Sequence, residues 1–357
     1  MTTGDMIRTG WRRGVFAPLL LGLLAAVAAP AGADTAWPVQ NRLQGKVKDG
    51  KVDKAEDVSG IACAPGAVPR LCLAVDDETQ GAQVVILTDG GLIAGDFIRL
   101  IDDGRAGKPL ELDAEGVAYA DDFFYVVGSQ GRARHETDAD KEATNQAKAA
   151  ATRKVFRIAL SADLATGALT GAPTIAESGA LATLLQSDPA LAPFVDLPLS
   201  KNGLTVEGIA VRGDDLYAGL RGPVLADGSA VIAKVPLAAL FEGKAGAVTL
   251  YRLNLGKDSL GDARGIRDLT VDQGGFLLIA GPENDPPKKH RIEGGDYAVY
   301  SWNEVQAIKL ADLAAYGKKV KPEALLPMDG NGAMLRALLL FDGAKEGMPT
   351  PVEIPLQ

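Results

Sequence analysis

A short alternation of polar and small apolar residues recurs along the chain and predicts a repeated β-hairpin. It reads Glu-Gly-Val-Ala from Glu115 and Glu-Gly-Ile-Ala from Glu207. Ten residues after each Glu, a second apolar run carries a tyrosine, Tyr125 or Tyr217. Weaker versions of the phrase begin at three other positions, Ser59, Arg267 and Glu323. Because one supersecondary unit that returns at intervals of tens of residues marks a repeat architecture, the pattern predicts an all-β fold, a β-propeller.

Further apolar runs predict the outer strands of each blade. They are five or six residues long, rich in β-branched and aromatic residues, and mostly bounded by Gly, Asp or Pro, as strands are. Third strands are expected at 84–88, 155–160, 231–235 and 297–302, and fourth strands at 97–101, 248–253 and 305–310.

The spacing of the repeated phrase sets the number of blades. The five phrases lie 56, 92, 60 and 56 residues apart, which suits a four-stranded blade plus its connection. The long gap holds segment 138–153, whose Asp, Lys, Ala and Gln content predicts a helical insertion, and a second helical patch at 178–192. We therefore expect five blades, with six as the alternative. The last blade lacks one strand, and segment 37–47 is expected to supply it and close the ring.

The N-terminal segment has the pattern of a signal peptide. Three arginines precede an apolar stretch of about 15 residues, which is shorter than the ~20 needed to span a bilayer, and Ala31-Gly32-Ala33 forms a small-residue cleavage site. We expect cleavage after Ala33, a single propeller domain over 34–357, and a periplasmic or secreted protein with no stable membrane insertion.

The acidic composition and the two cysteines indicate which partners and which cellular compartment suit the protein. The net charge of −9 disfavours nucleic acid as a partner. Cys63 and Cys72 flank one hairpin turn, so a disulfide is expected in an oxidising compartment. With two His in the chain, a zinc site is not expected.

The hairpin repeat places the first residue of each phrase at one mouth of a central channel. In any hairpin, the start of the first strand and the end of the second lie at the same end, and the first strands of a propeller line its channel. The mouth is therefore expected to gather carboxylates, arginines and small polar residues: Glu115, Glu207, Glu323, Ser129, Arg132, Asn202, Arg221, Arg264, Arg267 and Asp268.

Two interpretations of this mouth remain open. In the first, the Glu residues pair with Arg from neighbouring blades and serve the structure alone. In the second, Glu115, Glu207 and Glu323 bind a divalent cation, with calcium the cation that suits carboxylate oxygens. Arg side chains would then bind the phosphate or carboxylate group of a small anionic molecule.

The phrases from Glu115, Val206 and Arg264 resemble those of an uncharacterised bacterial family, a domain of unknown function. That family is distantly similar to the esterase-like and phytase-like propellers. The resemblance covers about residues 55 to 345 and implies a β-propeller. In the phytase-like relatives the comparable Glu-Gly strand starts line the pocket, which matches Glu115 and Glu207 here. Ser59, Arg267 and the Glu323-Ala324 pair depart from the pattern.

The sequence thus supports two hypotheses of function. One is a cation-assisted hydrolase of esters or phosphoesters, with Glu115 and Glu207 binding the cation or acting as acid and base, and with Arg221 and Arg267 holding the anion. The other is a non-catalytic periplasmic scaffold that binds a ligand or a protein at the same mouth. Raised pKa values of Glu residues in an open pocket would favour the hydrolase.

Overall fold

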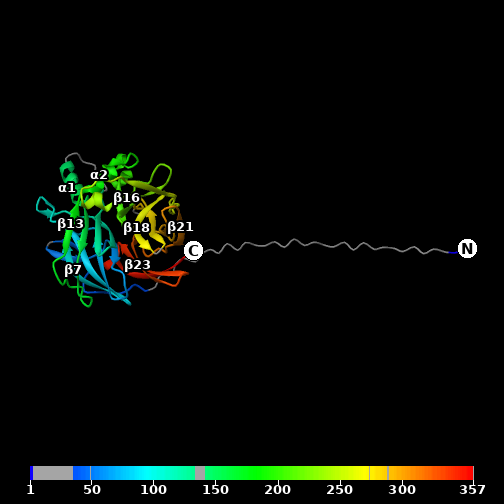
Figure 1. Cartoon of the computed structure of the whole chain (residues 1–357), viewed down its shortest axis with the longest axis horizontal. Helices are drawn as coiled ribbons and strands as arrows, with labels where there is room; N and C mark the ends of the chain where they lie inside the picture. Colours follow the sequence, from blue (N-terminus) through cyan, green and yellow to red (C-terminus); the bar gives the residue numbers. More distant parts are fainter. Residues whose placement is uncertain (3–34, 49, 133–140, 273, 288, 357) are drawn as a thin grey trace.

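Five sheets stand around a common axis in the computed structural model, which describes residues 1–2, 35–48, 50–132, 141–272, 274–287 and 289–356 (Figure 1). The strands that follow one another in each blade are antiparallel from the inner strand outward, and successive blades follow the chain. This is a five-bladed β-propeller and confirms the predicted fold class. The strand numbering below runs outward within each blade.

The predicted strands are found with small shifts at their ends. The first three blades consist of β4 (Val58–Cys63), β5 (Arg70–Asp76), β6 (Gly81–Thr88) and β7 (Gly91–Arg99), then β10 (Ala114–Ala120), β11 (Phe123–Gly128), β12 (Val155–Ala159) and β13 (Thr174–Ser178), then β14 (Thr205–Arg212), β15 (Asp215–Gly222), β16 (Ala230–Pro236) and β17 (Thr249–Leu253). The last two consist of β18 (Arg264–Asp272), β19 (Gly275–Pro282), β20 (Ala298–Trp302) and β21 (Ala307–Asp312), then β22 (Lys321–Gly330), β23 (Met334–Asp342) and β24 (Thr350–Pro355).

The connections carry the short helices and two small hairpins. The 92-residue gap holds insertions rather than a sixth blade, and the predicted helical segment 138–153 contains α1. The helices in the connections are α1 (Glu142–Thr152), α2 (Ala180–Ser187) and α3 (Leu237–Phe241), with the single turns η2 (Ala192–Phe194), η3 (Leu199–Lys201) and η4 (Lys345–Gly347). The two small hairpins are β2 (Gln44–Lys48) with β3 (Lys51–Lys54), and β8 (Gly104–Arg105) with β9 (Lys108–Pro109).

The N-terminal segment does not complete the last blade, contrary to the expectation for 37–47. Instead, β1 (Val39–Gln40) pairs in parallel with β7 at the outer edge of blade 1, and blade 5 has three strands. The backbone N–H of Trp37 does reach blade 5, donating to the carbonyl oxygen of Pro349 at 2.7 Å. The open outer edge of blade 1 therefore receives the N-terminal strand.

The ring closes instead through direct contact between blades 1 and 5, which lie side by side in Figure 1. The segment before β4 meets the end of β23 and η4. The amides of Gly343 and Ala344 donate to the carbonyl oxygen of Glu56 at 2.8 and 3.1 Å, and that of Glu346 donates to Ala55 at 2.6 Å.

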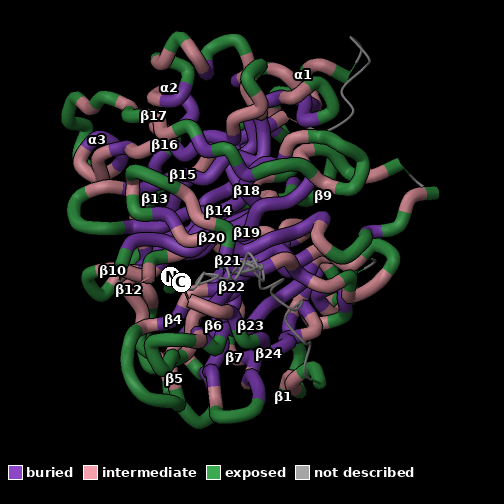
Figure 2. The backbone as a smooth tube through the Cα atoms, turned by 90° about the vertical axis from the view of Figure 1, so that its right-hand side faces the viewer, coloured by how far each residue is buried: buried purple, intermediate pink, exposed green. Residues whose placement is uncertain are grey.

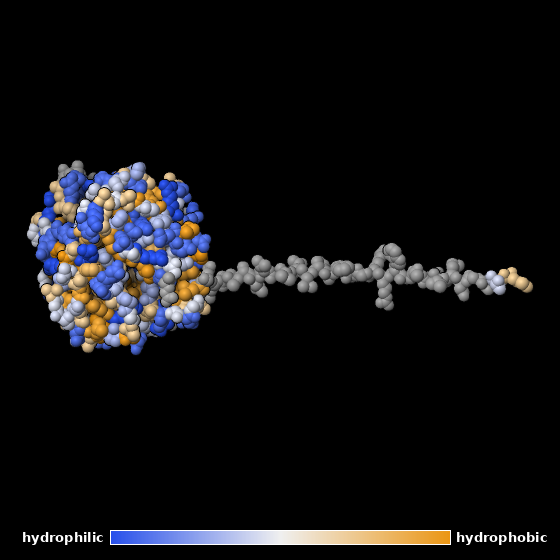
Figure 3. Space-filling model, viewed as in Figure 1, coloured by the Kyte–Doolittle hydropathy of each residue, from blue (hydrophilic) through white to orange (hydrophobic). Residues whose placement is uncertain are grey.

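The core consists of apolar clusters between neighbouring blades. Leu73 and Val84 of blade 1, for example, pack with Phe124 and Phe156 of blade 2, and all four are almost fully buried. Burial follows the strands of every blade, whereas exposed residues concentrate in the connections (Figure 2). On the face drawn in Figure 3, hydrophilic and hydrophobic residues are interspersed.

Close packing of the inner strands explains the glycines of the repeated phrase. A Cβ on Gly208 would lie 2.3 Å from the amide nitrogen of Leu269, and one on Gly116 would lie 2.9 Å from that of Ile209. These distances are shorter than a side chain tolerates, so glycine lets neighbouring inner strands meet at the axis.

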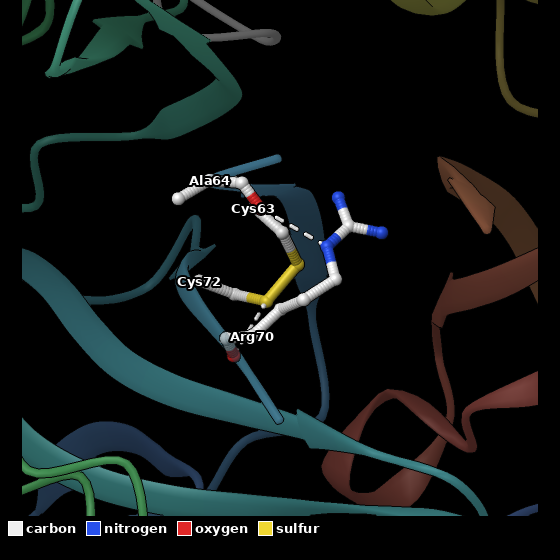
Figure 4. The surroundings of a disulfide bond; sticks show 4 residues. All are labelled: Cys63, Ala64, Arg70 and Cys72. Carbon is white, nitrogen blue, oxygen red and sulfur yellow. Dashed lines mark hydrogen bonds between the residues drawn. A yellow bond between two sulfur atoms is a disulfide. The ribbon is translucent and has the colours of Figure 1, made fainter. Parts of the chain in front are cut away.

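Cys63 and Cys72 form the predicted disulfide, which links β4 to β5 (Figure 4). It lies at the end of the channel opposite the mouth. Within the described ranges, no helix is long and apolar enough to cross a membrane. The disulfide is compatible with an oxidising compartment. The predicted signal peptide lies outside the described residues apart from Met1 and Thr2, so export stays a prediction.

Candidate functional site

A β-bulge at the start of every inner strand creates the ring of channel residues. The pairing register shifts between Val58 and Gly60, and at the matching place in the four other inner strands. The residues left out of register are the five that begin the repeated phrase: Ser59, Glu115, Glu207, Arg267 and Glu323. A bulge leaves its extra residue unpaired and re-aims its side chain, so five bulges direct five polar side chains to one level of the channel.

The strand pairing also places the ends of the second strands beside this ring. Ala114 pairs with Gly128 and Thr205 with Gly222, so the start of the inner strand and the end of its neighbour share one end of the blade. Connections from second to third strands and from fourth to first strands leave the sheets at the same end. Both α1 and the β8–β9 hairpin belong to such connections.

A cavity of about 640 Å³ opens at this mouth. Its lining combines carboxylates, basic residues and small side chains from blades 1, 2, 3 and 5, from α1 and from the β8–β9 hairpin. The polar and charged members are Asp77, Arg105, Lys108, Glu111, Asp113, Glu115, Ser129, Arg132, Thr144, Lys148, Thr152, Thr205, Glu207, Arg221, Glu323 and Asp342.

Two buried arginines neutralise the inner carboxylates. Arg221 donates to Oε1 of Glu207 at 3.0 Å and to Oδ1 of Asp285 at 3.0 Å. The Nη2 atom of Arg267 contacts Glu323 and lies 3.6 Å from Oε2 of Glu207. This part of the ring agrees with the structural interpretation of Glu–Arg pairing between blades.

Glu115 and Glu207 have opposite electrostatic surroundings. Burial disfavours the charge on Glu207, but the guanidinium groups of Arg267 and Arg221 outweigh it and hold the pKa below its usual value. Burial raises the pKa of Glu115 well above its usual value, and the carboxylates of Glu207, Asp113 and Asp77 raise it further. Arg267 opposes that shift only weakly. One carboxyl of the ring is therefore compensated, and its neighbour is not.

Glu115 joins two groups of acidic side chains. One carboxylate oxygen each of Glu115, Glu207 and Glu323 lie within 4.8 Å of one another, and so do one each of Asp77, Asp113 and Glu115. Asp113 precedes β10 with a left-handed backbone (φ 55°), a conformation that Asp tolerates better than most residues. Asp77 follows β5, and burial raises its pKa well above the usual value.

A second charged group lies where blades 1 and 5 meet. Lys321 forms an ion pair with Asp342, and its Nζ atom lies 3.7 Å from Oδ1 of Asp285. Burial disfavours the charge on Asp342, but Lys321 outweighs it, so the pKa of Asp342 is lowered. Burial and a hydrogen bond with Asp342 raise the pKa of Asp57 to about 8.

Basic side chains form the rim of the cavity. Arg105 and Lys108 come from the β8–β9 hairpin and Lys148 from α1, and all three are exposed. Arg105 donates from Nε to Oγ1 of Thr144, which ties the hairpin to the helix at 2.9 Å. Arg132 pairs with Glu142 in the first turn of α1 at 2.9 Å. The cavity thus has a floor of buried carboxylates, some paired with arginine, and a rim on separate elements where three exposed basic residues outnumber the exposed Glu111.

The structure brings some of the predicted site residues into the cavity and leaves others outside it. Those that line it are Glu115, Glu207, Glu323, Ser129, Arg132 and Arg221. Arg267 lies fully buried beneath, against Glu207 and Glu323.

Asn202, Arg264 and Asp268 do not line the cavity, because backbone groups engage them. Asn202 exchanges two hydrogen bonds of 2.8 Å with the backbone of Val224. Arg264 donates to the carbonyl oxygens of Asp296 and Leu255. Asp268 accepts from the amides of its chain neighbour Leu269 at 2.8 Å and of Leu325 in the next blade at 2.6 Å. These three side chains support connections and blade contacts.

The basic rim was missed by the sequence reasoning, although a signal for it exists. The connections 100–113 and 129–154 are among the longest in the chain. By the hairpin rule that located the ring, both leave their blades at the mouth. The basic residues within them could therefore have been assigned to the rim. The same rule places Asp77, directly after β5, and Asp113, directly before β10, at the mouth.

Comparison with known proteins identifies a family but no activity. The model of a family described as "Protein of unknown function (DUF3616)" matches residues 74–347. A search of the curated proteins finds no match to the chain.

Solved structures give distant likenesses. A mutant sialidase of Trypanosoma rangeli with trans-sialidase activity is 10% identical with a TM-score of 0.42, over 91% of this chain and 59% of that one. An exo-β-1,3-galactanase of Phanerochaete chrysosporium is 8% identical with a TM-score of 0.43, over 91% and 64%. An arabinanase of Bacillus subtilis is 11% identical with a TM-score of 0.40, over 85% and 96%. The chain spans less than two thirds of the first two proteins, and likenesses at this level support no argument about activity.

Proposed function

This chain belongs to the DUF3616 family of proteins of unknown function, and we propose from its own site that it is a cation-assisted hydrolase of ester or phosphoester bonds in small anionic molecules. The observation that carries the proposal is the division of charge in the mouth cavity. Buried carboxylates, two of them paired with Arg221 and Arg267, form its floor, and the exposed residues Arg105, Lys108 and Lys148 form its rim together with Glu111.

The rim is suited to an anionic substrate. Arg105, Lys108 and Lys148 are exposed around an opening of a cavity large enough for a small molecule. Guanidinium groups match phosphate and carboxylate oxygens in a two-pronged geometry, and lysine adds a point charge. A phosphate or carboxylate group of the substrate would bind here.

The floor supports the reaction itself. Its carboxylates suit a divalent cation, which would polarise the scissile carbonyl or phosphoryl oxygen and activate a water molecule. Ser129 and Thr205 offer hydroxyl groups beside them. An anionic group held at the rim and a cation held at the floor would orient the bond between them.

We assign anion binding to the exposed basic residues of the rim and not to Arg221 and Arg267. The sequence suggested these two arginines as the clamp, but their guanidinium groups are engaged by Glu207, Glu323 and Asp285. Releasing either to a substrate would leave a buried carboxylate without its partner, which is costly. When the exposed basic residues bind a substrate, no buried carboxylate loses its partner.

A hydrolase panel tests the proposal. The full chain is assayed against p-nitrophenyl phosphate, bis(p-nitrophenyl) phosphate and p-nitrophenyl acetate, with CaCl₂ and with EDTA. We expect turnover of at least one substrate, and a fall of about 100-fold or more in kcat for Glu115→Gln. The control is Asp122→Asn, which removes one exposed carboxylate at the opposite end of the channel.

The same panel can overturn the proposal. Absence of turnover with all three substrates, with or without calcium, would favour the non-catalytic binding scaffold. Turnover that Glu115→Gln and Asp122→Asn leave equally unchanged would move the reaction away from this cavity. A double variant, Arg105→Ala with Lys148→Ala, should raise KM for phosphate substrates with little change in kcat, since it removes binding charge but no floor residue.

A further inference from the structure

We propose that the mouth cavity binds the phosphate monoester of a sugar or an open-chain polyol, with its phosphate at the basic rim and its hydroxyl groups at Ser129 and Thr205. This ligand class deepens the proposed function, on which cleavage of the ester rests, but binding can be measured without turnover. Two buried hydroxyl groups that line the cavity distinguish this class from other anionic esters.

The hydroxyl groups of Ser129 and Thr205 are buried and yet incompletely hydrogen-bonded. The two residues are 2% and 6% exposed, and both line the cavity. Ser129 Oγ accepts the amide of Gly131 at 3.3 Å, but its own proton has no acceptor in the part of the chain that the structure describes. Oγ1 of Thr205 makes no hydrogen bond with any described residue. Because buried polar groups are nearly always hydrogen-bonded, these two hydroxyl groups are left for water or a ligand.

The backbone fixes the two hydroxyl groups beside each other. Ser129 follows β11 of blade 2, and Thr205 begins β14 of blade 3. The amide of Val206 donates to the carbonyl oxygen of Ser129 at 2.8 Å, which joins the two blades at this point. A Cβ on Gly131 would lie 3.2 Å from Oγ1 of Thr205 and 3.6 Å from Oγ of Ser129. Glycine therefore leaves open the space next to both oxygens, where a ligand can reach them.

A pair of hydroxyl groups suits the hydroxyl groups of a ligand. Each side-chain hydroxyl donates one hydrogen bond and accepts others, and so does a hydroxyl of a sugar or polyol. A ligand hydroxyl would replace the hydrogen bonds of the water that it displaces, whereas an alkyl chain would leave both side chains without partners. A site built in this way discriminates against the analogue that lacks the hydroxyl.

The carboxylates of the cavity floor disfavour a second phosphate group beside the hydroxyl pair. Glu207 lies on β14 with Thr205. Burial raises the pKa of Glu115 well above its usual value, and neighbouring carboxylates raise it further, so added negative charge is unfavourable in this region. Arg221 and Arg267 are already engaged by carboxylates. An uncharged part of the ligand that carries hydroxyl groups suits this floor, whereas a polyphosphate does not.

The charge of the rim matches one phosphate group. Arg105, Lys108 and Lys148 are exposed, and Glu111 is the exposed carboxylate among the lining residues that the structure describes, which leaves an excess of two positive charges. A phosphate monoester carries a charge of about −1.5 to −2 at pH 7. The cavity of about 640 Å³ has the size of a pocket for a small molecule. It can therefore hold a phosphate at the rim and the polyol at the floor.

Isothermal calorimetry of the full chain in EDTA tests the inference. The probes are D-glucose 6-phosphate, D-sorbitol 6-phosphate and n-hexyl phosphate, which have equal numbers of carbon atoms and one phosphate group, but hexyl phosphate lacks the carbon-bound hydroxyl groups. We expect at least one hydroxylated ester to bind about tenfold or more tightly than hexyl phosphate. Inositol hexakisphosphate should bind no more tightly than that ester, because one phosphate group matches the charge of the rim.

Variants of the hydroxyl pair assign this preference to its source. Thr205→Val keeps the branched shape of the side chain without its hydroxyl, and Ser129→Ala removes the other hydroxyl. Each should reduce the preference to about threefold or less, since one neutral hydrogen bond is lost, and should leave the affinity for hexyl phosphate within about threefold of the wild type. Thr205→Ser, the matched control, keeps a hydroxyl and should retain the preference. Arg105→Ala with Lys148→Ala should weaken both kinds of ester by a similar factor.

Several outcomes would overturn the inference. Hexyl phosphate that binds as tightly as both hydroxylated esters, or no binding of any probe, would remove the ligand class. A preference that survives in both Thr205→Val and Ser129→Ala, with Tm values showing that the variants are folded, would remove the assignment to the hydroxyl pair. Tighter binding of inositol hexakisphosphate than of the monophosphates would contradict a site for one phosphate group.

The two proposals fail in different ways. If a hydroxylated monophosphate binds with the expected preference but no ester is turned over with CaCl₂, the ligand class stands and the hydrolase is wrong. If p-nitrophenyl phosphate is turned over but the hydroxylated esters bind no better than hexyl phosphate, the hydrolase stands and the polyol specificity is wrong.

Discussion

Asp268 lies near the ring, but its side chain connects neighbouring blades and does not face the cavity. It is 5% exposed, and its two oxygens accept the amides of Leu269 and Leu325, the second in the neighbouring blade. It stands in the phrase where blades 1, 2 and 3 have glycine. A carboxylate can occupy that position because it satisfies the amide of the adjacent inner strand.

The stability of the protein should depend on pH through Asp268. Burial raises the pKa of this group to about 7 in the fold, against backbone hydrogen bonds that lower it. The folded state therefore binds more protons than the unfolded state between about pH 4 and 7, so this contribution is complete below pH 4 and is lost as pH rises through 7. The free energy of unfolding should fall by at most about 1.4 kcal/mol per pH unit in that window.

Urea unfolding of wild type and Asp268→Asn at a series of pH values checks this. The asparagine cannot titrate, so the stability advantage of the wild type over the variant should be largest near pH 4 and should shrink toward pH 8. A difference that stays constant, or grows with pH, would contradict the assignment of the raised pKa to Asp268.

At the scale of the strand, the glycine of the repeated phrase determines how closely the inner strands approach. Gly208 packs against the backbone of β18, and its missing Cβ leaves room for the amide of Leu269. The bulge that directs Glu207 into the channel lies one residue earlier. In this phrase, the glycine allows the inner strands to approach closely, and the bulge directs the side chain before it into the channel.

Gly208→Ala should therefore destabilise the fold strongly. The new Cβ would lie 2.3 Å from a backbone nitrogen that cannot move without displacing β18. We expect a loss of about 3 kcal/mol or more, at the upper end for overpacking in a core. The matched control is Gly90→Ala in the β6–β7 turn, where no atom lies within 4 Å of the added Cβ. Equal Tm values for the two variants would contradict the close approach.

At the scale of the whole molecule, the ring is closed without a blade that combines strands from the N-terminal and C-terminal segments. Blade 5 has three strands, and its outer strand β24 packs Val352 and Ile354 into the cluster between blades 4 and 5. Hydrogen bonds from η4 and the preceding turn join blade 5 to the segment before β4. The first and last blades thus depend on each other for their buried surface.

Loss of packing in the last blade should lower the stability of the whole ring. Ile354 is fully buried, so Ile354→Ala should cost about 2–5 kcal/mol. Far-UV circular dichroism and the fluorescence of Trp302 in blade 4 should shift together in one transition. Val305→Ala, at a residue that is 89% exposed, should change stability by about 0.5 kcal/mol or less. Separate transitions for the two probes would contradict cooperative closure.

The sequence by itself determined the repeated hairpin, the inner strands and the level of the ring at Glu115 and Glu207, because these follow from local alternation and from the geometry of a hairpin. It left five and six blades open, and the tertiary structure decided for five. It also indicated the disulfide, since Cys63 and Cys72 flank one turn. Which carboxylate has a partner was decided by the tertiary structure alone. Arg267 forms ion pairs with Glu207 and Glu323 in neighbouring blades, whereas no ion pair joins Glu115 to the part of the chain that the structure describes. Pairing between blades depends on distances across the axis, which no local pattern contains. For the same reason, the chain could not show in advance that its N-terminal strand joins blade 1, or that α1 and the β8–β9 hairpin meet above the floor.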